Sequence, residues 1–190
     1  MNRLAIMSIL STAILLFAGS SPSYSKELPA TEEQALDVRI GTFNLWRSDI
    51  GKDEYSWERR RDRLARAIVD CGMDVFAAEE VDTAMFRQLP ALVEAKGGNY
   101  SWQTFSPYDA EGKGSVKAQA IVYKTDVFEM LDFHRFWCSE TPDKMSTGWD
   151  EVKFKRGACC ATLRHKAGGK RIFVMASHFP LGPSSHSSGS

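Results

Sequence analysis

The hydrophobic pattern of the chain changes its period once, and that change limits the folds it can adopt. Apolar residues recur at helical spacing in 57–71 and in 82–96, and each segment follows a short apolar run typical of a strand, at 37–43 and 74–78. After Asn99 the pattern predicts strands only, at 102–106, 119–124, 128–136, 157–165 and 171–178. Two strand–helix units followed by a run of strands predict an α/β domain in which helices cover a mixed sheet.

Particular residues predict how the two helices begin and end. Gly72 suits the carboxyl end of the first helix, and Asp82 is a favourable N-cap for the second. Pro90 is expected to kink the second helix or divide it in two, because proline lacks the backbone N–H that a helix interior needs. The arginine run 59–61 is expected to lie on the solvated face of the first helix.

The amino-terminal segment has the features of an export signal. Arg3 provides a short positive region, residues 4–19 carry no charge, and Ser23 and Ser25 fit a small-x-small cleavage pattern. The apolar stretch is shorter than the roughly 20 residues that cross a bilayer comfortably. We therefore expect a signal peptide at 1–25 that is cleaved on export to the periplasm, the extracellular space or the secretory pathway, with a retained anchor as the alternative.

The rest of the chain is predicted to hold one domain between two polar segments. Residues 26–36 have the composition of a linker, the domain extends over 37–181, and the low-complexity tail at 182–190 is expected to be disordered. The 24 basic and 24 acidic residues cancel, so the chain has no bulk basic field with which to grip nucleic acid or anionic lipid.

The four cysteines would enter a compartment where disulfides persist if the chain is exported. Cys159 and Cys160 are neighbours in a predicted strand, so their side chains should point to opposite faces of the sheet. We expect Cys138 to form a disulfide with one of the two, Cys159 or Cys160, and buried, unpaired thiols are the alternative. The cysteine spacing does not match that of a zinc site.

Polar side chains close the first two predicted strands. Asn44 closes the first and Glu80 the second, and ligands gather at the carboxyl ends of strands in open α/β sheets. A carboxylate oxygen with an amide oxygen is hard-ligand chemistry, which suits Mg²⁺ or Mn²⁺ completed by water and substrate phosphate. The alternative is a turn asparagine and a solvated glutamate, and Glu79 leaves open which of the two adjacent carboxylates faces a ligand.

Two later residues are candidates for contact with a phosphate. His178 ends the last predicted strand, where an imidazole can hydrogen-bond a phosphate oxygen or carry a proton near neutral pH. Arg156 precedes a strand and is expected to pair with Asp150 or to meet a phosphate. His134 and His165 lie within strands and are expected to be structural.

Taken in chain order, several short motifs resemble the endonuclease/exonuclease/phosphatase superfamily, metal-dependent phosphohydrolases with a nuclease-I-like fold. The motifs are TFNLW at 42–46, Trp57 and Arg60 at a helix start, AAEEV at 77–81, AIVYK at 120–124, FWCSETPD at 136–143, GWD at 148–150, Arg156, and ASHF at 176–179. The resemblance implies the amino-terminal half of a four-layer α/β sandwich, with a mixed sheet, helices on one face, and the second sheet missing.

The resemblance also implies roles for the candidate residues. Asn44 is similar to the catalytic asparagine that orients the metal-bound carboxylate, Glu80 to the metal-binding glutamate, and His178 to a catalytic histidine that contacts the phosphate. The implied cofactor is Mg²⁺ or Mn²⁺, and the implied reaction is in-line attack of water on phosphorus, with an Asp–His pair activating the water. The sequence departs from the family pattern at Glu79, where Gln is usual, and at Ala176–Ser177, where Asn–Thr is usual.

The family's Asp–His pair and its GDFN segment have no match after Leu181. We therefore expect an exported phosphohydrolase or phosphodiesterase domain that is truncated and inactive alone. A non-enzymatic exported binding module and a shortened gene model are the alternatives. Members of the family pack two sheets face to face, so a missing second sheet would leave the apolar face of the first sheet uncovered. Such a face predicts self-association or a partner that covers it. Nucleic acid, sugar phosphate, phosphoinositide and sphingomyelin-type head groups all stay open as substrates.

Overall fold

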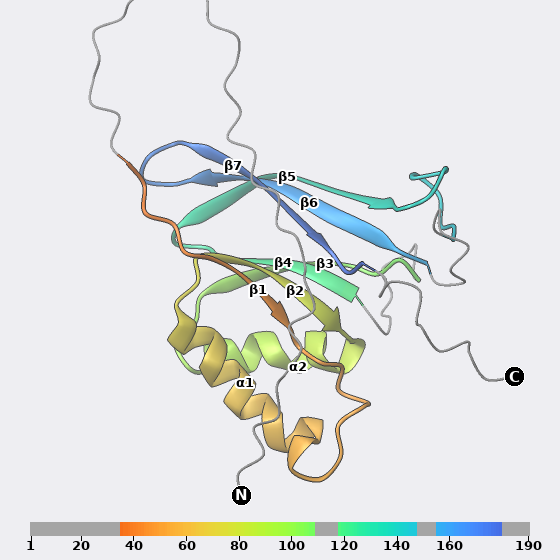
Figure 1. The fold of residues 1–190 in the computed structure, drawn as a ribbon. Coiled ribbons are helices and arrows are strands. Elements are labelled where there is room, and N and C mark those ends of the chain that lie inside the picture. The colour runs from red at the N-terminus through yellow and green to blue at the C-terminus, as the bar shows by residue number, and fades with distance from the viewer. Residues whose placement is uncertain (1–34, 109–117, 148–154, 180–190) are drawn as a thin grey trace, which may run out of the picture.

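The strands form two sheets that pack face to face, and both helices cover the outer face of one of them (Figure 1). The structure, a computed structural model, describes residues 35–108, 118–147 and 155–179. The elements in chain order are β1 (Ile40–Asn44), the 3-10 helix η1 (Asp53–Tyr55), α1 (Trp57–Cys71), β2 (Val75–Val81), α2 (Thr83–Glu94), β3 (Tyr100–Phe105), β4 (Ala118–Lys124), β5 (Phe128–Trp137), β6 (Gly157–His165) and β7 (Arg171–Ser177).

Sheet A contains the first four strands in the order β1-β2-β4-β3, with β1 and β2 parallel and the other pairs antiparallel. Helices α1 and α2 bury their apolar stripes on it, because residues such as Ile68 and Leu89 meet Phe76 and Val122 of the sheet. The predicted helix 57–71 is confirmed, and Gly72 ends it with a left-handed φ of 61°, a conformation that suits glycine.

The expectation that the second sheet is missing is wrong. Strands β5, β6 and β7 form a separate antiparallel sheet, sheet B, in which each strand pairs with the next along the chain. A second apolar core lies between the sheets and includes Val75 and Ile121 from sheet A, and Leu163 and Val174 from sheet B. The period-two pattern identified these strands correctly, but a period does not reveal which neighbour a strand pairs with.

Two expectations about the helices are also corrected. Pro90 lies inside one uninterrupted helix, α2, and does not divide it. The helix loses one backbone hydrogen bond there, but buried Met85, Leu89 and Val93 anchor it to the sheet on both sides of Pro90. The predicted N-cap is confirmed, because the Asp82 carboxylate accepts a hydrogen bond from the Met85 N–H at 2.9 Å.

The register of sheet B rules out the expected disulfide between Cys138 and either Cys159 or Cys160. The N–H of Cys138 donates to the carbonyl of Arg156, which lies three residues before Cys159 along the neighbouring strand. At about 3.3 Å per residue this separation is about 10 Å, beyond the reach of a disulfide. Cys159 is buried in the core between the sheets, Cys160 points to the opposite face as predicted, and all four cysteines are free.

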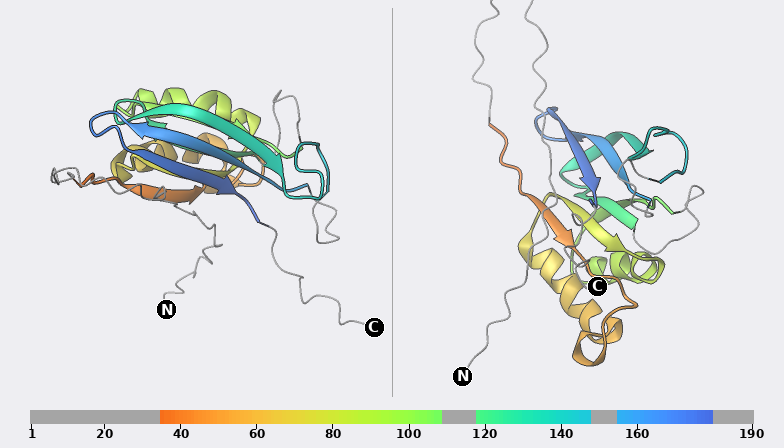
Figure 2. Two further views of the ribbon diagram at one scale, coloured as in Figure 1. Left: turned by 90° about the horizontal axis from the view of Figure 1, so that it is seen from above. Right: turned by 45° about the vertical axis from the view of Figure 1, so that its right-hand side comes forward.

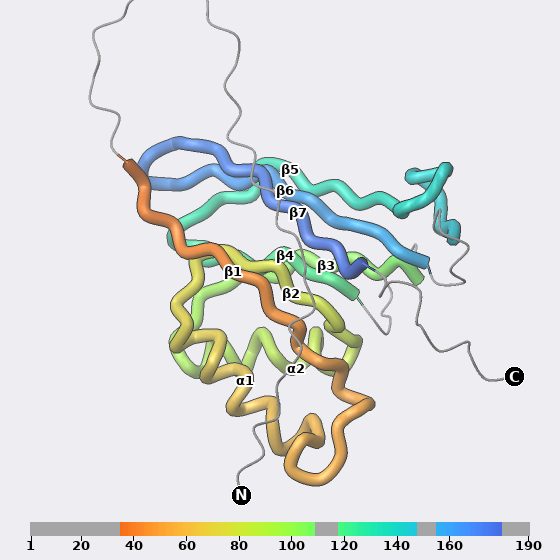
Figure 3. Tube along the Cα trace, in the orientation of Figure 1, coloured from red at the N-terminus to blue at the C-terminus, as the bar shows by residue number. Residues whose placement is uncertain are grey.

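One end of the sandwich gathers strand ends from both sheets. Figure 2 shows the two sheets stacked, and Figure 3 traces β1, β2 and β7 toward this same end. Phe105 at the end of β3 packs edge-on against Trp137 at the end of β5, with ring centroids 5.2 Å apart. Gln119 near the start of β4 donates to the carbonyl of Gly157 at the start of β6 at 2.6 Å. We call this the site end.

Among the described residues, no helix is long and apolar enough to span a membrane. The expected signal peptide at 1–25, the tail at 182–190, and the whole GWD motif at 148–150 with its Asp150 lie outside the described residues.

Candidate functional site

A β-bulge at the end of β2 turns one glutamate out of the core. Ala78 pairs with Ala120 of β4 and Val81 with Ala118, so Glu79 and Glu80 together oppose a single residue of β4. Regular alternation would place Glu80 in the core beneath the helices, but Val81 occupies that position instead. The extra residue therefore makes the Glu80 carboxylate accessible at the site end.

The two adjacent glutamates have different environments. Glu79 is only 3% exposed, and its carboxylate accepts a hydrogen bond from the Thr42 hydroxyl at 2.9 Å. Glu80 is partly exposed and has a left-handed φ of 56°, which is strained for a residue with a side chain. Of the two carboxylates, that of Glu80 is therefore the one accessible to a ligand.

Asn44 holds the Glu80 carboxylate in place. It ends β1, parallel to β2, and its Nδ2 donates to Glu80 Oε1 at 3.1 Å. Its own amide oxygen accepts the backbone N–H of Trp46 at 2.9 Å. In this arrangement Asn44 positions Glu80 rather than offering its oxygen to a metal, which differs from the ligand role expected from the sequence.

Arg60 of α1 ties down the loop that follows Asn44. Its guanidinium donates to the carbonyls of Leu45 and Arg47, each at 2.8 Å, and also to that of Trp46. It lies over the rings of Trp46 and Trp57, 5.4 Å and 5.2 Å from their centroids. Burial lowers the pKa of Arg60. The expectation that this arginine lies on a solvated helix face is therefore wrong, since the carbonyls of the folded loop draw the side chain inward.

Asp82 connects the same loop to the second helix. One carboxylate oxygen caps α2, and the other accepts the backbone N–H of Ser48 at 2.6 Å. Arg47 forms an ion pair with Asp49 in this loop, and this hydrogen-bonded carboxylate raises the pKa of Arg47. The loop between β1 and α1 is thus held from both helices.

The sheet B side of the site end contains the other predicted pair. Arg156 Nη1 donates to the backbone carbonyl of His178 at 3.2 Å, so these two residues lie together. The Ser177 hydroxyl donates to the carbonyl of Gly157 at 3.0 Å. Burial raises the pKa of the neighbouring Cys138 thiol, despite the Ser177 hydroxyl and the Arg156 charge, which both lower it.

The structure therefore forms two pairs of predicted residues, Asn44 with Glu80 and Arg156 with His178. Gln119 connects them: it is the residue of β4 opposite the bulge, and it donates across to Gly157, next to Arg156. The sequence analysis did not identify Gln119. It could have been found, because a glutamine at a core-facing position of the strand AQAIVYK must have a hydrogen-bond partner inside the fold.

The oxygen atoms available at Glu80 determine which kind of metal ion this site could bind. Among the described residues, no group of three or more His, Cys, Asp or Glu side chains could hold a metal ion. Mg²⁺ is commonly bound by one or two carboxylates, with waters and substrate phosphate as its other ligands. A single, positioned carboxylate with one oxygen engaged by Asn44 fits that mode of binding.

No protein-family model and no curated protein matches the chain. Among solved structures, an endonuclease/exonuclease/phosphatase from Bacteroides vulgatus matches with a TM-score of 0.66 and 30% identity, covering 74% of this chain and 52% of that one. A family protein from Bacteroides thetaiotaomicron matches with a TM-score of 0.64 and 28% identity, over 77% of this chain and 52% of that one.

A mannosyl-6-phosphatase from Bacteroides thetaiotaomicron is also similar, with a TM-score of 0.60 and 30% identity over 72% of this chain and 50% of that one. The chain thus spans about half the length of the solved structures it matches. The resemblance read from the sequence motifs is confirmed: this chain has the α/β fold of the endonuclease/exonuclease/phosphatase family over about half of that fold.

Proposed function

We propose that this chain is a domain of the metal-dependent phosphohydrolase class, with a site for phosphate esters. The observation that carries the proposal is the accessible Glu80 carboxylate, turned out by a bulge and held by Asn44 at the carboxyl end of two parallel strands. The fold supports the phosphohydrolase class, because the solved relatives include family phosphatases.

Each site residue receives a role in this proposal. Glu80 would hold Mg²⁺ or Mn²⁺, and Asn44 positions its carboxylate by the 3.1 Å hydrogen bond. A divalent cation at this site supplies Lewis-acid polarisation of a phosphoryl oxygen. Arg156 and His178 lie together at the same end of the sandwich and contribute positive charge and a hydrogen bond toward a phosphate.

We further propose that the chain is exported and is inactive alone. The uncharged run at 4–19 supports export.

The inactivity rests on the position of a possible general base. The described His–Asp pair, His134 with Asp132, lies on the face of sheet B that is turned away from sheet A, so it does not serve the Glu80 site as a general base. The inferred behaviour of the chain alone is metal-dependent binding of phosphate without turnover.

Small phosphate esters are the substrates we favour. One relative of 30% identity is a mannosyl-6-phosphatase, and the formal net charge of zero offers no bulk attraction for nucleic acid.

The first prediction tests Glu80. Titration calorimetry of inorganic phosphate into the chain, with and without Mg²⁺, is expected to show binding that requires the metal. Glu80→Gln should abolish this binding, because the amide keeps the shape of the side chain but loses the negative charge that the cation needs. Assays with p-nitrophenyl phosphate and bis-p-nitrophenyl phosphate follow turnover of a monoester and a diester in the same samples.

Glu129→Gln is the matched control, since Glu129 is an exposed glutamate on β5 of sheet B. It should leave metal-dependent phosphate binding unchanged. Equal binding by wild type and Glu80→Gln would exclude Glu80 as the metal-binding carboxylate. Turnover that Glu80→Gln abolishes would keep the phosphohydrolase assignment and overturn the inactivity of the chain alone.

A further inference from the structure

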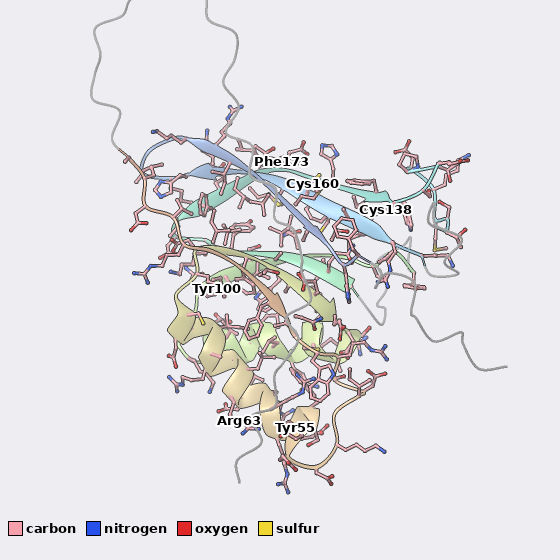
Figure 4. The ribbon with its side chains drawn as sticks, in the orientation of Figure 1. Tyr55, Arg63, Tyr100, Cys138, Cys160 and Phe173 are labelled. Carbon is pink, nitrogen blue, oxygen red and sulfur yellow. The ribbon has the colours of Figure 1, made fainter. Side chains whose placement is uncertain are left out.

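Two large aromatic side chains remain in water beside the candidate site. Trp46 is 42% exposed and Tyr55 is 57% exposed, although burying such rings would stabilise the fold. Their rings meet edge to face, with centroids 6.2 Å apart and planes inclined by 66°. Both belong to the connection between β1 and α1, and Figure 4 labels Tyr55 near the start of α1. The fold thus presents an exposed aromatic pair.

The indole of Trp46 is held rather than loosely exposed. The Arg60 guanidinium lies 5.4 Å from the ring centroid and also donates to the carbonyl of Trp46. Because the guanidinium lies over one face of the ring, a ligand can approach only the remaining surface. The indole is therefore a preorganised contact surface, which lowers the entropy lost on binding.

The backbone joins this indole to the candidate metal site. Trp46 has a left-handed φ of 53°, a conformation that persists only where the surroundings impose it. The surroundings include Asn44, whose amide oxygen accepts the Trp46 N–H at 2.9 Å while its Nδ2 donates to Glu80 at 3.1 Å. One side-chain amide thus orients both the carboxylate and the residue that carries the indole.

The backbone that carries the other aromatic, Tyr55, is held by contacts of its own. A Cβ added at Gly51 would clash with the Tyr55 carbonyl oxygen, so the loop closes tightly against η1 at this point. Arg63 of α1, labelled with Tyr55 in Figure 4, donates to the carbonyl of Glu54 at 3.1 Å. Tyr55 is therefore anchored to the same helix as Trp46.

The charge of this loop indicates which ligands suit it. Residues 46–55 contain two basic and three acidic side chains, a formal charge of −1. Single-stranded nucleic acids are instead bound by aromatics set in a basic groove. A loop of this charge suits the uncharged organic part of a small ester, and an indole offers that part a flat apolar surface for stacking.

We propose that Trp46 and Tyr55 form a subsite that stacks against a ring in the organic part of a small phosphate ester, while Glu80 serves the phosphate end. The proposal rests on the function proposed above for its phosphate end. The ring is that of a sugar or a nucleobase, because the apolar C–H face of a sugar and the flat face of a base can both lie against an indole.

Affinity measurements in Mg²⁺ test this subsite. Wild-type protein should bind glucose 6-phosphate or adenosine monophosphate on the order of tenfold more tightly than glycerol phosphate, which has no ring. Trp46→Ala should remove this preference and leave inorganic phosphate binding unchanged, whereas Trp46→Phe should keep most of it. The two ring compounds distinguish a sugar site from a base site. Phe173→Ala, at an aromatic residue of similar exposure on sheet B, is the control and should leave the ring preference unchanged.

A second measurement separates this subsite from the phosphate site. The indole N–H signal of Trp46 in a nitrogen-15 spectrum, assigned with Trp46→Phe, should shift with adenosine or glucose and stay in place with glycerol. A shift without phosphate binding would support the subsite and refute the proposed function. A ring preference that survives in Trp46→Ala, or a Trp46 signal that no ring compound moves, would overturn the subsite whether or not phosphate binds through Glu80.

Discussion

Glu80 stands in a backbone conformation that its residue type disfavours. A non-glycine residue at a φ of 56° costs about 1 kcal/mol or more relative to an unstrained conformation. The hydrogen bond from Asn44 and the bulge in β2 keep it there. Such strain at an accessible carboxylate is typical of a functional position, where geometry has been retained at the expense of stability.

Glycine and alanine at this position separate the strain from the side chain. Both Glu80→Gly and Glu80→Ala lose the carboxylate, but only glycine tolerates the left-handed φ without a Cβ. We expect the glycine variant to be more stable than the alanine variant by about 1 kcal/mol, measured by urea denaturation. Equal stabilities, or a more stable alanine variant, would show that the backbone at Glu80 is not strained.

At this scale the sequence predicted which residues lie at the site end, but not how they are oriented. Asn44 and Glu80 were identified because each closes a strand, and the structure joins them by a hydrogen bond. The bulge was not predicted, since the order of apolar and polar residues in AAEEV does not indicate that the strand contains an extra residue. The inward course of the Arg60 side chain depends on loop carbonyls that exist only after folding.

Strands β1, β2 and β4 are also fastened at the end opposite the candidate site. The Asp74 carboxylate, just before β2, accepts the Arg39 N–H at 2.9 Å and the Lys124 ammonium at 2.8 Å. Burial alone would raise the pKa of Asp74, but these hydrogen bonds and charges outweigh it and hold that pKa below its ordinary value. Asp74 thus links the three strands in its ionised form.

Replacing this carboxylate should have a pH-dependent effect. Asp74→Asn should lower the free energy of unfolding by about 1–2 kcal/mol at neutral pH, because two hydrogen bonds lose a charged acceptor. The pKa is lower in the folded state, so this stabilisation is complete above the unfolded pKa of about 3.9 and disappears as pH falls through the folded value. Urea denaturation at pH 7 and below pH 4 measures the difference.

Asp126→Asn is the control for this series, since Asp126 is an exposed aspartate in the turn between β4 and β5. An Asp74→Asn penalty that is the same at both pH values would refute the proposed role of the ionised carboxylate.

The elements were predicted well because their signals are local. The helix 57–71 and the strand 157–165 were predicted with the bounds the structure has, and the other strands within a few residues. The effect of Pro90 was mispredicted, because packing of Leu89 and its neighbours outweighs the loss of one backbone hydrogen bond. Tertiary contacts of this kind do not appear in a local pattern.

At the level of the whole molecule, sheet A is covered on both faces, by the helices and by sheet B. Within residues 35–108, 118–147 and 155–179, the face without a covering layer is therefore the outer face of sheet B. On this face Phe173 is 38% exposed, and Cys160 and Met175 lie beside it on paired positions of neighbouring strands. Figure 4 labels Phe173 and Cys160 on this sheet. The sequence predicted an uncovered apolar face but assigned it to the wrong sheet, since it did not reveal that the later strands pair only with one another.

We propose that this outer face mediates association between copies of the chain. Multi-angle light scattering should show a molar mass that rises with concentration, because apolar side chains there gain by leaving water. Phe173→Asp should shift the protein toward the monomer, whereas Phe86→Asp should not, since Phe86 has a similar exposure but lies on α2. A stable, monodisperse monomer at all concentrations would refute the association.

Synthesis begins at the amino terminus, and the strand order makes sheet A depend on residues that are made late. The ribosome releases β1, β2 and β3 before β4, the strand that lies between β2 and β3. Most of the described side chains that cover the sheet face formed by Val75, Ala77 and Ile121 belong to β5, β6 and β7, as far as Ala176. A nascent chain therefore carries an open apolar face until β7 has been made, and this interval is when it is most exposed to wrong strand pairing.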